Sequence, residues 1–182
     1  MKKPLIILGK NIYLKEFQVS DITSDYINWL NDPEVNQYLE SRYVKQTKKT
    51  VEAYVRSFAG CDRKLLFGIF DRAAGLHIGN ISFSDLNHRH GYGVIGIAVG
   101  RKSFWGKGIG TEAIKLLVAY GFKKLKLKRI EAGIYANNLG SIAIFKKAGF
   151  KIEAILRERY RLKNKMVDGL IVGLLKKDRS VA

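Results

Sequence analysis

Three glycines at alternate positions are the residues of this sequence with the clearest chemical use. The stretch FWGKGIGT, residues 104–111, holds Gly106, Gly108 and Gly110, and a long helical pattern follows at once. A helix N-terminus leaves backbone N–H groups unpaired and carries about half a positive charge, and glycines let the backbone approach an anion closely. The stretch therefore predicts a phosphate or pyrophosphate cradle, to which Lys107 adds charge. The alternative is a tight turn that needs glycine only for its backbone conformation.

Two familiar phosphate-binding motifs do not fit this stretch. The Walker motif G-x-x-x-x-G-K-[ST] is absent, and the dinucleotide fingerprint G-x-G-x-x-G is here G-x-G-x-G. Glu131 does lie about 20 residues on, where that fingerprint places an acid. However, the fingerprint opens the first strand–helix–strand unit of its domain, whereas several strands and helices precede the glycines here. A dinucleotide site is disfavoured.

Hydrophobic periodicity indicates the elements that position this loop. Apolar runs and period-two alternation predict strands, and stripes at helical spacing predict helices. In chain order we expect a strand at 11–17; helices from Asp21, from Pro33 to about Leu39 and from about Thr47 to Ala59; strands at 65–70, 77–83 and 92–99; the helix after the glycines; a strand at 129–135; a helix at 141–147; and closing strands at 150 to about 160 and 166–175.

This order predicts the fold class. Short turns make the three central strands an antiparallel meander, whereas the strand–helix–strand passage after residue 99 needs a parallel pair. We therefore predict an α/β (α+β) fold with a mixed, mostly antiparallel seven-stranded sheet flanked by helices. No linker or repeat interrupts the chain, so residues 1–182 are expected to form a single domain.

Composition indicates a reducing compartment. Cys61 is the only cysteine, which excludes an intrachain disulfide and a cysteine-cluster metal site. In the opening MKKPLIILG the apolar run from Leu5 to Leu8 is too short for a signal-peptide core, and no apolar stretch approaches the roughly 18–20 residues of a membrane span. His77, His88 and His90 lack metal-ligand spacing, so no metal is expected. We predict a cytoplasmic protein without a membrane partner.

Charge is distributed unevenly and points to an anionic ligand. The formal net charge is +17, and residues 101–182 carry 20 Lys and Arg against six Asp and Glu, a net +14. Such an excess concentrates anions, so a phosphate-bearing ligand, a nucleic acid or an acidic protein would be attracted. A lysine-rich solvated surface explains the same numbers.

Longer stretches resemble the motifs of one enzyme superfamily. IGIAVGRKSFWGKGIGTEAI (95–114) resembles the acetyl-CoA-binding motif of the GNAT N-acetyltransferases, in which a strand leads to Q/R-x-x-G-x-G/A and a helix. YANNLGSIAIFKKAGF (135–150) is similar to their next motif, N-x-x-S-x-x-x-[Y/F]-x-x-x-G-F. NWLNDPEVNQYL (28–39) and VDGLIVGLL (167–175) look like the RimJ/RimL-type branch, which contains ribosomal-protein N-terminal acetyltransferases. The resemblance spans nearly the whole chain and implies the GNAT acyl-CoA N-acyltransferase fold.

That resemblance implies acetyl-CoA (coenzyme A) as cofactor and a site for it. Backbone groups of Ile97 and Val99 would pair with the pantetheine arm, amides of residues 105–110 would hold the pyrophosphate, and Lys146 or Lys147 would approach the ribose phosphate. Trp105 departs from the motif, which has Q/R there. The implied cofactor-binding set is Ile97, Ala98, Val99, Trp105, Gly106, Lys107, Gly108, Ile109, Gly110, Thr111, Asn138, Ser141 and Lys147.

Acetyl transfer to a primary amine by direct attack needs a neutral amine, a stabilised oxyanion and a route for protonating the thiolate. A backbone N–H near Ala98 or Val99 would serve the oxyanion. The superfamily's frequent general-acid tyrosine falls on Phe145, which has no proton to give. Ser141 is at the position where RimL-like enzymes are thought to use a serine for the thiolate, although it could instead cap or pack its helix.

The general base is the least determined role. The position that matches the glutamate of RimL-like enzymes is Tyr160, and Glu158, two residues earlier, is expected on the same strand face. The catalytic candidates are thus Ser141, Glu158 and Tyr160. Further carboxylates are Glu153, Asp85 and Glu34, and deprotonation through water is the alternative to all of them.

The acceptor is expected between the front helices and the meander. Polar candidates for its binding are Asn31, Glu34, Tyr38, Arg42, Asn80 and Ser82. A basic protein would repel polyamines, which favours a nucleotide-linked amino sugar or a protein N-terminal amine, that is, a small-molecule or peptide acceptor. A homodimer stays open.

Two other functions compete with catalysis. Phe145 leaves room for an acyl-CoA-binding regulator without catalysis. A basic nucleic-acid-binding module is disfavoured, because LRERYRLKNK (156–165) interleaves only Tyr160 with its basic residues.

Overall fold

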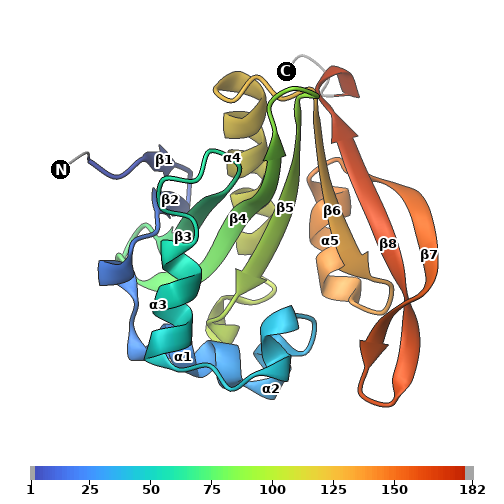
Figure 1. Ribbon diagram of the computed structural model, residues 1–182. Helices are drawn as coiled ribbons and strands as arrows, with labels where there is room; N and C mark the ends of the chain where they lie inside the picture. The colour runs from blue at the N-terminus through green and yellow to red at the C-terminus, as the bar shows by residue number, and fades with distance from the viewer. Residues whose placement is uncertain (1–2, 179–182) are drawn as a thin grey trace.

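An eight-stranded sheet is the framework of the computed structural model, which describes residues 3–178 (Figure 1). The strand order is β1-β2-β3-β4-β5-β6-β8-β7, and every neighbouring pair is antiparallel except β5 with β6. The strands are β1 Ile6–Leu8, β2 Ile12–Glu16, β3 Leu65–Asp71, β4 His77–Asn87, β5 Tyr92–Val99, β6 Arg129–Tyr135, β7 Lys151–Leu162 and β8 Lys165–Leu175.

Helices cover both faces of this sheet. The α-helices are α1 Ser24–Asn31, α2 Pro33–Asn36, α3 Lys48–Arg56, α4 Ile109–Lys123 and α5 Leu139–Lys147, and the 3-10 turns are η1 Val19–Asp21, η2 Glu40–Tyr43, η3 Lys102–Phe104 and η4 Lys176–Asp178. Figure 1 shows α3 in front of the sheet and α4 behind it. No helix within residues 3–178 has the length and apolarity that a membrane crossing requires.

The predicted mixed, mostly antiparallel sheet flanked by helices is confirmed, with eight strands instead of seven. The additional strand is β1, which pairs with β2 from Ile6↔Lys15 to Leu8↔Tyr13. One helix start also differs from the prediction. Asp21 lies in η1, where its carboxylate accepts from Gln18 N and pairs with Lys15, so α1 begins only after Thr23, whose hydroxyl accepts from Tyr26 N.

Two apolar clusters hold the helices on the sheet. The larger fills the space between the sheet and α4, with Phe67, Phe83, Ile114 and Leu117 fully buried. The smaller lies under α1 and α3 and contains Phe17, Tyr26, Val51, Val55, Leu66 and Phe70. Helices cover each face of the central strands, so the sheet is a rigid support for the loops at its lower end in Figure 1.

β5 and β6 separate along their length, as Figure 1 shows. Their parallel pairing ends at Val94↔Glu131, whereas β6 stays paired with β8 as far as Tyr135↔Gly169. The rest of β5, Ile95–Val99, thus has no strand partner on its β6 side within the described residues. The sheet opens into a V whose β5 arm presents backbone groups that no neighbouring strand of the described residues pairs.

The direction of those groups follows from strand alternation. Gly100 N donates to Ile78 O across the β4–β5 ladder, and in an antiparallel pair alternate residues face the partner. Ala98 therefore points its N–H and C=O toward β4. Ile97 and Val99 point theirs into the opening.

Candidate active site

The glycine loop leads into the uncapped N-terminus of α4. Gly106 and Gly108 have φ of 74° and 80°, and Gly108 is the N-cap, without a side chain to accept the first helical N–H groups. Both are exposed, and no atom lies within 4 Å of a Cβ built at either. The helix of 15 residues thus begins, without a side-chain cap, directly after an exposed glycine loop.

Each glycine also has a structural reason to be there. Positive φ accounts for Gly106 and Gly108. Gly110 is buried, and a Cβ there would lie 3.0 Å from Ile144 Cδ1 on α5, so it allows close packing of α4 on α5. The number of glycines therefore does not by itself distinguish an anion cradle from a tight turn. The absence of a side-chain cap behind an exposed loop is what supports the cradle.

Trp105 ties this loop to the end of β5. Its indole Nε1 donates to the carbonyl oxygen of Val99 at 2.7 Å. The sequence indicated only that a polar Q/R side chain is missing here. The structure gives the tryptophan a role of its own, because it occupies one of the backbone groups that face the opening.

Asn138 and Ser141 divide their roles at the start of α5. Asn138 is the N-cap, and its Oδ1 accepts from Ser141 N at 3.0 Å. Ser141 contributes its backbone N–H to this cap and not its hydroxyl. Of the two roles left open for Ser141, capping of α5 therefore falls to Asn138, and the Ser141 hydroxyl is free for another purpose.

A basic hollow lies beside the start of α4. Its volume is about 500 Å³, and its lining includes Lys10, Lys115, Lys147 and Thr111. Glu112, in the same wall, accepts from Asn11 N and Asn11 Nδ2, both at 2.9 Å. Lys146 and Lys147 are both exposed at the C-terminal end of α5.

A second cavity, of about 480 Å³, lies between the front helices and strands β4 and β5. Gly96, Ala98 and Gly100 line it from β5 and its end, and their small size leaves its floor open. Its wall is mainly apolar and aromatic. The residues that line it are Tyr26, Trp29, Leu30, Val35, Leu39, Glu40, Ser41, Gln46, Val51, Tyr54, Leu66, Asn80, Ile81, Ser82, Gly96, Ile97, Ala98 and Gly100.

Two polar atoms of this cavity wall are buried and have no hydrogen-bond partner in the structure: Asn80 Oδ1 and Ser41 Oγ. Asn80 is 9% exposed, and its Nδ2 makes one long contact of 3.4 Å with Phe67 O. Most buried polar groups in proteins are hydrogen-bonded. Unpaired polar atoms in a cavity wall therefore mark where a ligand can form hydrogen bonds.

A tyrosine–arginine cluster connects η2 with β6 and β7, which lie on the other side of the opening from β5. Tyr135 OH donates to Glu40 Oε1 at 2.9 Å, and Arg42 Nη2 donates to Tyr135 OH at 2.8 Å and to Arg161 O at 2.9 Å. Tyr160 stacks on Tyr135 with ring centroids 4.1 Å apart. Burial raises the pKa of Tyr135, so its hydroxyl stays protonated and can donate to Glu40.

The predicted acceptor residues are only partly brought together. Asn80 and Ser82 line the cavity. Tyr38, whose ring lies 5.5 Å from that of Tyr135, and Arg42 belong to the neighbouring cluster. Asn31 instead bonds to the Gln46 backbone, and Glu34 pairs with Lys102 at 2.6 Å.

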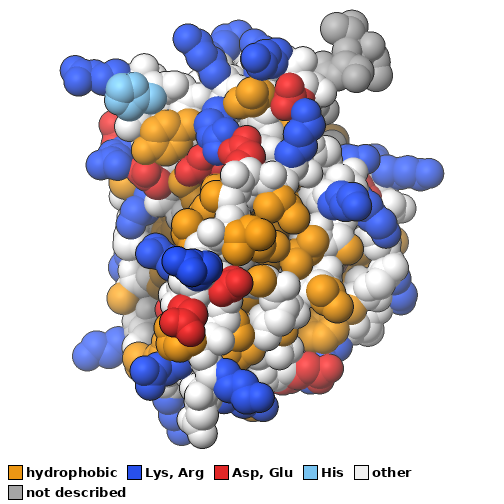
Figure 2. Space-filling view, turned by 90° about the vertical axis from the view of Figure 1, so that its right-hand side faces the viewer, with side chains coloured by type: hydrophobic (Ala, Val, Ile, Leu, Met, Phe, Trp, Pro, Cys, Tyr) orange, Lys and Arg blue, Asp and Glu red, His pale blue; other side chains and the backbone are white. Residues whose placement is uncertain are grey.

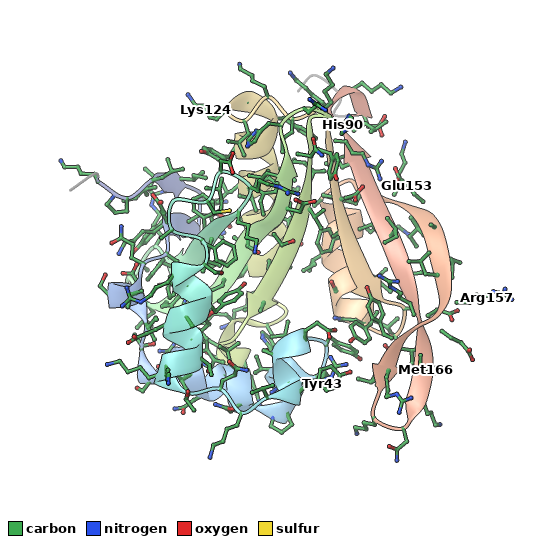
Figure 3. The ribbon with its side chains drawn as sticks, in the orientation of Figure 1. Tyr43, His90, Lys124, Glu153, Arg157 and Met166 are labelled. Carbon is green, nitrogen blue, oxygen red and sulfur yellow. The ribbon has the colours of Figure 1, made fainter. Side chains whose placement is uncertain are left out.

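The carboxylates considered as general bases lie elsewhere. Arg129 holds both oxygens of Glu153 and keeps the pKa of that carboxyl low. Figure 3 shows Glu153 near the upper end of β7, whereas Tyr43 of η2 lies near the lower end of the molecule. Asp85 pairs with Arg63 at 2.7 Å. Neither Asp85 nor Glu34 lines the cavity.

Glu158 sits in a bulge that breaks strand alternation. Leu156 pairs with Gly169 and Tyr160 with Val167, so five residues of β7 span three of β8. Glu158 has a φ of 50°, is exposed, and donates its N–H to Asp168 Oδ1 at 2.8 Å. The alternation that was expected to put Glu158 on the face of Tyr160 therefore does not apply here.

Comparison with known proteins identifies the family to which this architecture corresponds. The family model described as acetyltransferase (GNAT) domain matches residues 11–151. The chain is 31% identical over 183 residues to the "Probable N-acetyltransferase YjcK" of Bacillus subtilis (strain 168), covering 95% of this chain and 98% of that protein. It is 30% identical over 166 residues to the "Uncharacterized N-acetyltransferase p20" of Bacillus licheniformis, covering 90% of each.

Solved structures agree with the fold. Spermidine N-acetyltransferase from Vibrio cholerae, in complex with CoA and spermine, superposes with a TM-score of 0.84 at 18% identity, over 93% of this chain and 98% of that one. The RimL alpha-N-protein acetyltransferase in complex with coenzyme A gives a TM-score of 0.84 at 16% identity, over 94% and 98%. At these identities the likeness bears on the fold alone.

Proposed function

This chain belongs to the GNAT acetyltransferase family, and from that premise we propose that it transfers an acetyl group from acetyl-CoA to a primary amine by direct attack, as a member of the RimJ/RimL-like branch. The observation that carries the proposal is the free edge of β5, Ile95–Val99, which ends beside the uncapped start of α4. Solved neighbours of this fold hold CoA or acetyl-CoA.

Cofactor binding is assigned to backbone groups at both places. Ile97 offers its N–H and C=O, directed into the opening of the V, to the amides of a pantetheine arm, in the way that an added strand pairs with a sheet edge. The N–H groups around Gly108 and Ile109 bind the diphosphate at the helix start. Lys147, with Lys10 and Lys115 in the basic hollow, attracts the ribose phosphate.

Once acetyl-CoA and the amine are positioned, acetyl transfer needs few catalytic groups. Acetyl-CoA supplies a thioester, which a neutral amine attacks without a covalent enzyme intermediate. Val99 N–H is the better oxyanion donor, because Ala98 directs its N–H toward β4. The Ser141 hydroxyl, free of capping duty, donates a proton to the thiolate. Glu158, Glu153, Asp85 and Glu34 lie outside the cavity wall, and Glu40, which does line it, accepts from Tyr135 OH, so deprotonation of the amine is assigned to water.

The acceptor enters through the cavity between the front helices and β4–β5, whose floor is formed by the same strand that binds the cofactor arm. A protein N-terminal amine and a nucleotide-linked amino sugar are the two acceptor classes in the proposal. The chain acts as a monomer or a homodimer. For the latter, the edge strand β7, on the face of the molecule shown in Figure 2, offers the exposed Ile152 and Ile155.

One experiment tests the proposal. The protein is incubated with acetyl-CoA and amines of each class, and free thiol is followed with a chromogenic disulfide. Amine-dependent thiol release is expected. Cofactor binding by calorimetry without release under any acceptor would favour an acyl-CoA-binding regulator, and salt-sensitive RNA binding without cofactor binding would favour a nucleic-acid module.

A further inference from the structure

The geometry points to the cavity as a binding site for a primary ammonium group carried on an uncharged, mainly apolar body, with Glu40 as the carboxylate that recognises the ammonium. The inference rests on the proposed function and narrows its acceptor. It is carried by the charges, the unpaired polar atoms and the aromatic surface of the cavity wall.

The charge of the wall is opposite to that of the protein. The chain as a whole is +17, yet no Lys or Arg is among the described residues that line the cavity, and Glu40 is the one carboxylate there. A ligand inside therefore meets a negative group and no cation of the wall itself, since Arg42 is linked to Glu40 only through Tyr135 OH. Overall charge predicts an anionic acceptor, but the local charge favours a cationic one.

Glu40 is held in place by Tyr135, the last residue of β6. Tyr135 OH donates to its Oε1 at 2.9 Å, and Arg42 Nη2 donates in turn to Tyr135 OH. One carboxylate oxygen is thereby fixed on the protein, and a carboxylate has further lone pairs to offer. The arrangement orients Glu40 at the cavity rim without a direct ion pair to Arg42. Its negative charge remains available to a ligand.

Of the two unpaired atoms of the wall, Asn80 Oδ1 can only accept a hydrogen bond, whereas the Ser41 hydroxyl can accept or donate one. Asn80 Oδ1 and Ser41 Oγ are buried without a partner. An amine or ammonium brings N–H donors, which can satisfy such groups. A phosphate or carboxylate brings only acceptors, would leave Asn80 Oδ1 unpaired, and would be repelled by Glu40.

The rest of the cavity wall is complementary to a ligand that is mainly apolar apart from its amine. Tyr26, Trp29 and Tyr54 contribute rings, and aliphatic side chains such as Leu30 and Val35 complete the surface. A volume of about 480 Å³ lies within the range of small-molecule pockets. Aromatic faces additionally attract cations. A flat or aliphatic amine therefore matches the wall better than a sugar linked to a nucleotide does.

A matched series of benzylamines tests this preference. 4-Methylbenzylamine and 4-(aminomethyl)benzoate have similar size and amine basicity and differ by one negative charge. With acetyl-CoA as donor, kcat/KM for the methyl compound is expected to exceed that for the benzoate by about tenfold or more. Equal values, or preference for the benzoate, would overturn the inference.

The role of Glu40 is tested by Glu40→Gln with Glu52→Gln as its control. Glu52 lies on α3, outside the cavity wall, and Glu52→Gln removes the same single negative charge as Glu40→Gln. Glu40→Gln should raise KM for 4-methylbenzylamine about tenfold, with kcat within about twofold, and reduce the discrimination against the benzoate. Glu52→Gln should change neither. Equal effects of both variants, or none from Glu40→Gln, would contradict the assignment.

Binding without turnover distinguishes a failure of the proposed function from a failure of the inferred acceptor preference. Trp29 is part of the wall, so each amine is also titrated by tryptophan fluorescence in the absence of acetyl-CoA. If no amine releases thiol, the proposed function falls, and the titration still decides whether the cavity prefers the methyl compound. If thiol is released but the benzoate binds equally well, only the inference about the acceptor fails.

Discussion

The indole Nε1 of Trp105 lies 2.7 Å from the carbonyl oxygen of Val99 and donates a hydrogen bond to it. This bond joins the glycine loop, which presents the N-terminus of α4, to the end of β5, which forms the free edge. The two halves of the proposed cofactor site are therefore linked by one side chain. A loop with several glycines gains order from such a bond, because glycine has the largest backbone freedom to lose.

Trp105→Phe keeps an aromatic ring but removes the donor. A hydrogen bond of this kind contributes about 1 kcal/mol, so we expect the dissociation constant for coenzyme A to rise about fivefold, measured by calorimetry, with little change in kcat at saturating acetyl-CoA. Tighter binding in the variant would reverse the interpretation. It would mean that the indole competes with the cofactor arm for the Val99 carbonyl.

Gly108→Ala tests the anion cradle against a purely conformational role for the loop. The φ of 80° makes any side chain costly by roughly 1–2 kcal/mol. Gly75→Ala is the matched control, because Gly75 has a φ of 65° in the β3–β4 turn, and neither position has an atom within 4 Å of an added Cβ. Both variants should lose similar stability in urea unfolding, but only Gly108→Ala should weaken coenzyme A binding, by about tenfold. Equal binding by both would leave the loop a turn.

Ser141→Ala separates proton donation from helix capping. Since Asn138 caps α5 and Ser141 contributes only its backbone N–H there, the substitution should leave the melting temperature almost unchanged. If the hydroxyl protonates the thiolate, kcat should fall by about 10²-fold or more. Asn138→Ala is the structural control and should cost about 1 kcal/mol of stability. An unchanged kcat for Ser141→Ala would exclude the proton-donor role.

Most of the fold could be predicted from the sequence because its elements have strong periodic patterns. The apolar residues Ile109, Ala113, Leu117 and Tyr120 of the predicted helix after the glycines recur at helical spacing, and each is buried or packs on the core. β1 could not be found, because a three-residue strand has too few positions to show alternation. Residues Asp21 and Thr23 are both good cap types, and only the contact of Asp21 with Lys15 decides between them.

The candidate site was predictable where it depends on the backbone and not where it depends on tertiary contacts. The glycine loop follows from a local pattern, whereas the backbone groups of Ile97 and Val99 were indicated only by the resemblance to the GNAT motif. The bulge around Glu158 has no glycine to signal it, so its positive φ of 50° breaks an alternation that looked regular. Glu40 carries no motif. It becomes a site residue only because η2 folds beside Tyr135, 95 positions later in the chain.

His77 is a buried histidine that the proposed chemistry does not use. It is 7% exposed, and its ring lies 4.8 Å from that of Phe17 and 5.1 Å from those of Trp29 and Phe70. Nε2 lies 2.9 Å from Gly79 O and, facing a carbonyl, carries the proton, whereas Nδ1 has no hydrogen-bond partner within residues 3–178. Burial lowers the pKa of His77 from 6.5 to about 4, so the ring is neutral near pH 7.

This lowered pKa predicts how stability depends on pH. Between about pH 6.5 and 4 the unfolded chain binds a proton at His77 and the folded chain does not, so stability is full above pH 6.5 and falls as the pH is lowered toward 4, by about 3 kcal/mol from this group. His77→Phe should flatten this part of the curve of unfolding free energy against pH, whatever its effect at pH 7. His88→Phe, at an exposed histidine, should keep the original slope. Parallel curves for His77→Phe and the unmodified protein would show that His77 does not cause the acid sensitivity.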